Sequence, residues 1–147
     1  MSDSDDINVS HIAICTANLE LSAKFYTEAL GFTPEFYVDI GEPFDILTQA
    51  PGLKGRAGFF HRGAVRIELA QFEVPETERQ DQGGSFLKIG LTHLSFIIKD
   101  IDAVARRIEE FGGQVHRQTR IAGTNGPMIF ASDPDGTPLE LWQREDG

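Results

Sequence analysis

The sequence predicts an α+β protein made of two tandem βαβββ modules that form a shared half-barrel cleft. The first observation behind this prediction is an internal repeat. The stretch "HIAICTANLELSAKFYTEALGF" begins at His11 and "HLSFIIKDIDAVARRIEEFGG" begins at His93, and the two align without a gap. The second observation is that short β-like segments follow each copy. A repeat of this kind indicates a duplicated structural unit.

Each copy opens with a short apolar strand that leads into a helix. Asn18 and Asp100 stand at the aligned N-cap positions, and Gly31 aligns with Gly113 where each helix should stop. The second helix has the clearer helical period, because apolar residues recur on one face. These residues are Ile101, Val104, Ala105, Ile108 and Phe111.

The segments after each helix read as strands joined by tight turns. "AGFFHR" and "VRIELAQF" are separated by Gly63 and Ala64, which predicts a hairpin. "PMIFAS" and "PLELWQ" flank "DPDG", a strong turn signal. We therefore expect about three strands after the helix in each half.

The chain is predicted to be a single domain over residues 1–147. The modules cover about 8–74 and 90–144, and a linker covers about 75–89, where "PETERQDQGG" is polar and rich in breakers. One module alone would have a marginal core. We therefore expect the two modules to pack together, cover each other's open sheet edges and form a common cleft.

Composition narrows the classes of partner. The net charge of −10 argues against nucleic acid or an anionic membrane, since both need a basic face. The single cysteine, Cys15, rules out an internal disulfide framework. The polar N-terminus "MSDSDDINVS" and the absence of a long apolar run predict a cytoplasmic protein. A small anionic substrate stays compatible, because several arginines could form a local positive patch.

Strand alternation places one histidine and one glutamate per half on the sheet face away from the core. The candidates are His11 and Glu68 in the first half and His93 and Glu140 in the second. Two imidazoles and two carboxylates suit one divalent ion of Zn, Ni, Co, Mn or Fe. Each residue taken alone also fits an ordinary strand position. The same residue types in the same phase of both halves favour a metal site.

The two repeat stretches, together with "VRIELAQF" and "FASDPDGTPLELWQ", resemble the vicinal oxygen chelate superfamily over residues 8 to 143. That superfamily includes glyoxalase I, methylmalonyl-CoA epimerase, extradiol dioxygenases, fosfomycin-resistance enzymes and bleomycin-binding proteins. The resemblance implies paired βαβββ modules, a homodimer and one divalent metal ion. Position by position, its ligands would be His11, Glu68, His93 and Glu140, as in glyoxalase I.

The resemblance also implies a reaction. A glyoxalase- or epimerase-type isomerase or lyase abstracts a proton alpha to a carbonyl through a metal-bound enediolate. Glu140 would be ligand and base, Glu68 would be ligand and second base, and the substrate would be a small carbonyl compound. Two alternatives stay open: a single-module, iron-dependent extradiol-type dioxygenase, and a metal-free binding protein of the bleomycin-resistance type.

Some positions depart from the patterns of individual members. Cys15 and Phe72 stand where bacterial glyoxalase I enzymes have the arginine and asparagine that hold glutathione. No carboxylate stands between Asp45 and Glu68, where epimerases have a second base. Neither glutathione nor a CoA thioester is therefore predicted. Arg66 shares the face of Glu68, and it would bind a substrate carboxylate or pair with a neighbouring acid.

Overall fold

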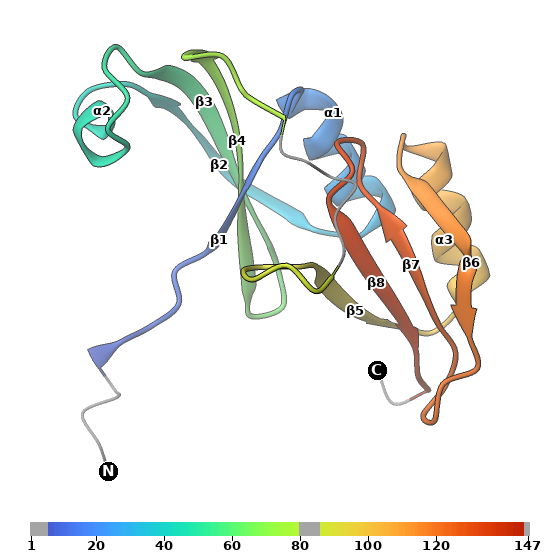
Figure 1. Cartoon of the computed structure of the whole chain (residues 1–147). Helices are drawn as coiled ribbons and strands as arrows, with labels where there is room; N and C mark the ends of the chain where they lie inside the picture. The colour runs from blue at the N-terminus through green and yellow to red at the C-terminus, as the bar shows by residue number, and fades with distance from the viewer. Residues whose placement is uncertain (1–5, 80–85, 146–147) are drawn as a thin grey trace.

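Two four-stranded sheets with the same internal order make up the fold (Figure 1). The structure is a computed structural model that describes residues 6–79 and 86–145. One sheet has the order β1-β4-β3-β2 and the other β5-β8-β7-β6. The α+β class and the tandem βαβββ modules are thus confirmed. The strands are β1 (Ile12–Cys15), β2 (Thr33–Ile40), β3 (Lys54–Arg62), β4 (Val65–Val74), β5 (Leu94–Ile98), β6 (Gln114–Ile121), β7 (Met128–Ser132) and β8 (Pro138–Gln143).

The helices begin at the predicted caps. The Asn18 side chain accepts from the Leu21 backbone N–H at 3.1 Å, and Asp100 accepts from that of Ala103 at 3.0 Å. Gly31 ends the first helix at φ +74°. In the second half the positive φ falls on Gly112 rather than on the predicted Gly113. The helical elements are α1 (Leu19–Lys24), the π-helical turn η2 (Phe25–Ala29), α2 (Phe44–Leu47) and α3 (Ile101–Glu110).

Both predicted hairpins form. In the β3–β4 ladder Phe59 faces Glu68, and in the β7–β8 ladder Phe130 faces Glu140. The first strand of each module then pairs in parallel with the last, so that β1 lies beside β4 and β5 beside β8. This pairing puts each candidate histidine next to its candidate glutamate.

The remaining strands, β2 and β6, were expected in number but not located from the sequence. Both lie at a sheet edge, and most of their residues are exposed or half-buried. A strand that buries so little carries a weak alternation of apolar and polar residues. His116 lies on β6 and is therefore a strand residue.

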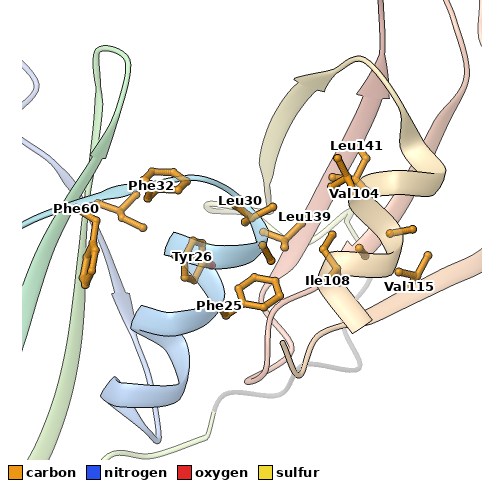
Figure 2. Packing of buried hydrophobic residues seen from close by; sticks show 14 of the residues in the cluster. Phe25, Tyr26, Leu30, Phe32, Phe60, Val104, Ile108, Val115, Leu139 and Leu141 are labelled. Atoms are coloured by element: carbon orange, nitrogen blue, oxygen red, sulfur yellow. The ribbon is translucent and has the colours of Figure 1, made fainter. Parts of the chain in front are cut away.

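The modules share one hydrophobic core. Phe25 and Tyr26 of η2 are fully buried and belong to the same cluster as Ile108, Leu139 and Leu141 of the second module (Figure 2). The helix formed by α1 and η2 lies between the two sheets, and α3 covers the second sheet (Figure 1). No helix within 6–79 or 86–145 combines the length and apolar character needed to cross a bilayer.

The turn between β7 and β8 ties the modules together. The buried Tyr26 hydroxyl donates to Asp133 at 2.8 Å. Burial, and secondarily the Asp133 carboxylate, raise the pKa of Tyr26 well above its ordinary value. Asp135 of the same turn accepts hydrogen bonds from the hydroxyls of Thr16 and Ser22. The "DPDG" stretch therefore turns the chain and also docks onto the first module.

Candidate metal centre

The first histidine–glutamate pair is formed where β1 meets β4. His11 directly precedes β1, and Ala13 lies opposite Glu68 in the parallel ladder. This register brings His11 Nε2 to 2.8 Å from Glu68 Oε2. Both side chains are mostly buried yet reach solvent, with 30% and 19% exposed. The pair is shielded but open to a ligand.

The second pair repeats this arrangement where β5 meets β8. His93 Nε2 lies 3.8 Å from Glu140 Oε2. Ser95 occupies the position that aligns with Ala13, and its hydroxyl donates to Glu140 Oε1 at 2.7 Å. Glu140 is thus held by a hydrogen bond from Ser95. Glu68 receives no such bond from the aligned position, because Ala13 has no hydroxyl.

Each histidine is oriented through its other ring nitrogen. Ser10 Oγ lies 2.9 Å from His11 Nδ1, and Thr92 Oγ1 lies 2.7 Å from His93 Nδ1. A hydrogen bond at Nδ1 fixes the ring, as the outer partners of metal-ligating histidines usually do. The arrangement leaves Nε2 of each ring facing its glutamate.

Sequence reasoning missed these outer partners and two further pairs. Phenylalanines opposite the glutamates, Phe59 and Phe130, pack edge-on against His11 and His93, with ring centroids 5.1 and 5.3 Å apart. A glutamine stands three residues after each glutamate and accepts the first backbone N–H of a helix. Gln71 Oε1 lies 2.8 Å from the Leu19 nitrogen of α1, and Gln143 Oε1 lies 2.9 Å from the Ile101 nitrogen of α3. The signal that could have found them is the repeat itself, extended beyond the histidines.

The four candidate ligands form two pairs and do not converge within one chain. Among the side chains described in 6–79 and 86–145, no group of three or more His, Cys, Asp or Glu lies close enough to hold one ion. A groove of about 470 Å³ does run between the modules. Its walls include Ala13 and Cys15 from the first module and His93 and Pro138 from the second. Each chain therefore presents two separate His–Glu pairs rather than one cluster of four residues.

The donor atoms of each pair suit a divalent ion, and their separations lie on either side of the spacing that such an ion needs. Nitrogen and oxygen ligands lie about 2.0–2.2 Å from zinc, so neighbouring ligand atoms lie roughly 3–3.5 Å apart. The separations of 2.8 and 3.8 Å bracket that range. Imidazole nitrogen with carboxylate oxygen is a donor set that Zn, Ni, Co, Mn and Fe all accept.

The positions that depart from family patterns are also placed. Cys15 is exposed, and its Sγ lies 3.9 Å from Thr77 Oγ1 in the groove wall. The backbone N–H of Phe72 donates to the same Thr77 oxygen at 2.9 Å. Arg66 forms an ion pair with Glu35, with Nη2 at 2.7 Å from Oε2. The expectation that Arg66 pairs with a neighbouring acid is therefore confirmed.

Comparison with known proteins shows the family to which the chain belongs. The family model of the Glyoxalase/Bleomycin resistance protein/Dioxygenase superfamily matches residues 8–141. The chain is 32% identical to the uncharacterized protein YaeR of Escherichia coli (strain K12) over 138 residues, covering 92% of this chain and 95% of YaeR. It is 28% identical to the uncharacterized protein YwkD of Bacillus subtilis (strain 168), covering 93% and 97%.

Solved structures agree on the fold. A glyoxalase family protein from Bacillus cereus superposes with a TM-score of 0.84 at 16% identity, covering 97% of both chains. Glyoxalase I of Leishmania major gives 0.65 at 21% identity, covering 95% of this chain and 88% of that one. The fosfomycin resistance protein FosX of Mesorhizobium loti gives 0.60 at 19% identity, covering 92% and 90%. The chain belongs to the glyoxalase/bleomycin resistance protein/dioxygenase superfamily.

Proposed function

We propose that the protein is a divalent-metal-dependent enzyme that abstracts a proton alpha to a carbonyl, an isomerase or lyase of the glyoxalase or epimerase type. The observation that carries the proposal is the repeated half-site, in which a histidine held through Nδ1 faces a half-buried glutamate in each module. A structural histidine needs no such duplication. A shared ion would use both pairs.

The complete centre would join the first pair of one chain to the second pair of another. Two observations support a homodimer of this kind. The pairs of one chain do not converge among the residues described. Ile89 and Leu91, which line the groove near His93, are almost completely exposed, and apolar surface of this kind usually marks an interface.

Each of the four residues then has a defined role. His11 and His93 hold the ion through Nε2, because Nδ1 of each ring is engaged by a hydroxyl. Glu68 is a ligand and the second base. Glu140 is a ligand and the principal base: Ser95 fixes one of its oxygens, while the other lies 3.8 Å from its histidine, further than the 2.8 Å of the first pair. A divalent ion held there would polarise the substrate carbonyl and stabilise the charge that develops on its oxygen.

The first test is metal content, measured by plasma mass spectrometry on purified wild-type protein and on His93→Ala. We expect close to one equivalent of Zn, Ni, Co or Mn per chain in the wild type and a loss in the variant. Iron, together with catechol-dependent oxygen uptake, would replace the proposal with a dioxygenase. A wild type that binds no metal after reconstitution would point to a binding protein.

The base is tested by Glu140→Gln, which keeps the size of the side chain and removes its basicity. Proton abstraction by a positioned base contributes about 10²–10⁴-fold to a rate. We expect turnover of a carbonyl substrate to fall by that order at equal metal occupancy. Turnover equal to that of the wild type would exclude Glu140 as the base.

A further inference from the structure

A second polar cluster lies in the first module, formed by Glu35 of β2, His61 of β3 and Arg66 of β4. Arg66 clasps the Glu35 carboxylate, with Nη2 at 2.7 Å from Oε2 and Nε at 3.3 Å from Oε1. His61 Nδ1 is shielded from solvent and lies 3.0 Å from Glu35 Oε1, within ion-pair distance but without the geometry of a hydrogen bond. The Glu35 carboxylate thus holds the Arg66 guanidinium by two contacts and lies beside the His61 imidazole.

This cluster shares a sheet face with the first half-site. His61 faces Arg66 across the β3–β4 ladder, just as Phe59 faces Glu68. Each cluster residue is two positions from its counterpart, and residues at that spacing point to the same face, about 7 Å apart. Phe59 in turn packs against His11. The cluster is therefore the next row of side chains beside the His11–Glu68 pair.

The cluster still has hydrogen-bond donors to offer. A guanidinium carries five N–H groups. The contacts with Glu35 use Nε and one N–H of Nη2, so Nη1 and the imidazole Nε2 lie outside them. Glu35 is only 19% exposed, whereas Arg66 and His61 are 41% and 43% exposed. The Glu35 carboxylate is half-buried, and the Arg66 and His61 side chains reach solvent.

The second module has no such cluster at the aligned row. Beside the Phe130–Glu140 row stands Ser132 opposite Pro138, in place of His61 opposite Arg66. The candidate metal ligands repeat between the modules, but these charged groups do not. A ligand that spans the assembled centre would therefore contact charged groups on the first module and none at the aligned row of the second.

We propose that His61 and Arg66, anchored by Glu35, bind an oxyanion of the substrate, a carboxylate or a phosphate-type group. The proposal rests on the function proposed above, because the metal centre would hold the carbonyl of the same molecule. The substrate is then a carbonyl compound with an anionic group at one end. That group would lie on the first module of one chain, beside a centre whose Glu140 comes from the other chain.

The test titrates the full-length protein with acetate and, separately, with inorganic phosphate, and follows side-chain NMR signals of Arg66 and His61. Acetamide serves as the neutral control. Arg66→Gln removes the charge and the fork. Arg117→Gln is the matched control, because Arg117 also pairs with a carboxylate, that of Glu109, but on β6 of the other module.

We expect saturable shifts centred on Arg66 and His61, no response to acetamide, and an affinity about tenfold weaker in Arg66→Gln, as the loss of a charge-assisted hydrogen bond predicts. Arg117→Gln should bind like the wild type. Preference for phosphate over acetate, or the reverse, identifies the anion class. Shifts that do not saturate, that lie elsewhere, or that saturate in Arg66→Gln with the affinity of the wild type would overturn the proposal.

The wild-type shift map remains decisive if Arg66→Gln does not fold. Each titration is run with metal-loaded and with metal-free protein. Anion binding at the cluster in a protein that never binds metal would separate the failure of the proposed function from a success of this inference. Metal binding without anion binding would support the proposed function and overturn this inference.

Discussion

Ser95 and Ala13 occupy aligned positions, and the Ser95 hydroxyl gives Glu140 a hydrogen bond that Ala13 cannot give Glu68. The Ser95 hydroxyl holds Glu140 at 2.7 Å, so Glu140 is oriented before any ligand arrives. The loss of an outer partner of a metal ligand typically weakens metal binding 10–100-fold. We therefore expect Ser95→Ala to lose affinity for Zn²⁺ within that range, measured by competition with a chelator.

Ser95→Thr is the matched control, since it keeps the hydroxyl and suits a strand. Its Zn²⁺ affinity should stay close to that of the wild type. Equal affinities in wild type, alanine and threonine variants would mean that the hydrogen bond does not support the ligand.

Tyr26 makes the folded state sensitive to alkali. Its buried hydroxyl keeps its proton because burial raises its pKa, whereas the unfolded tyrosine ionises near pH 10. Above about pH 10 the native state then holds more protons than the unfolded state, so the free energy of unfolding falls as pH rises. Urea denaturation at pH 8 to 11 should show this fall, and Tyr26→Phe should show a smaller one.

Tyr26→Phe also removes the hydrogen bond to the buried Asp133. At pH 8 it should therefore be less stable than the wild type by about 1–3 kcal/mol. Tyr37→Phe is the comparison, because Tyr37 is exposed and should change neither the stability nor its pH dependence. A wild-type stability that stays flat above pH 10 would contradict the assignment.

Among the elements, α3 depends on its first turn. Asp100 caps it, and Gln143 from β8 accepts the N–H of Ile101. Asp100→Ala should lower the free energy of unfolding by about 1 kcal/mol. Asp102→Ala changes the same turn of α3 but removes only an exposed ion pair with Arg120 of β6. It should lower the free energy of unfolding by less. Thermal or urea melts followed by circular dichroism measure both, and equal losses would argue against a specific cap.

Gly113 shows where close packing forbids a side chain. A Cβ there would meet the Ser132 carbonyl oxygen at 2.6 Å and Ile108 and Phe25 at 2.7 Å. Gly113→Ala should therefore destabilise the protein by about 1–3 kcal/mol or more. Gly41→Ala, whose nearest neighbour would lie at 3.9 Å, should stay close to wild type in the same urea titration. A Gly113→Ala variant as stable as the wild type would show that the backbone around Gly113 or Ser132 can shift to accept a Cβ.

The sequence predicted the elements that have a regular apolar pattern or a clear cap or turn, and it did not locate the edge strands. The repeat located both helix starts and both hairpins, since caps and turns depend on local residues such as Asn18 and the "DPDG" stretch. The edge strands β2 and β6 escaped because they bury little. The pairing of His11 with Glu68 followed from alternation, but the separation of the two pairs depends on how the modules pack. No local pattern encodes that packing.

At the scale of the whole molecule, the proposed shared centre makes a prediction about mixed dimers. His11→Ala and His93→Ala should each bind little metal alone. If centres form between chains, a dimer of one variant with the other has one centre with both histidines missing and one centre intact. Refolding the two variants together should therefore restore about one Zn²⁺ per mixed dimer, measured by mass spectrometry after size-exclusion chromatography.

Centres built within single chains would behave differently, because every chain in the mixture lacks one histidine. No metal would then return on mixing. The control is the double variant His11→Ala/His93→Ala mixed with wild type. In its mixed dimers, each centre between the chains has one intact pair and one damaged pair, so neither centre is complete.

Within residues 6–79 and 86–145, each strand ladder joins strands of the same module. The modules meet through the helices, the shared core and the β7–β8 turn. A module could therefore trade places with its counterpart from another chain without breaking any ladder, and only the helix and turn contacts would be re-formed with the newcomer. In such a domain swap the length of the segment between Val74 and Leu94, rather than strand pairing, would decide which modules become neighbours.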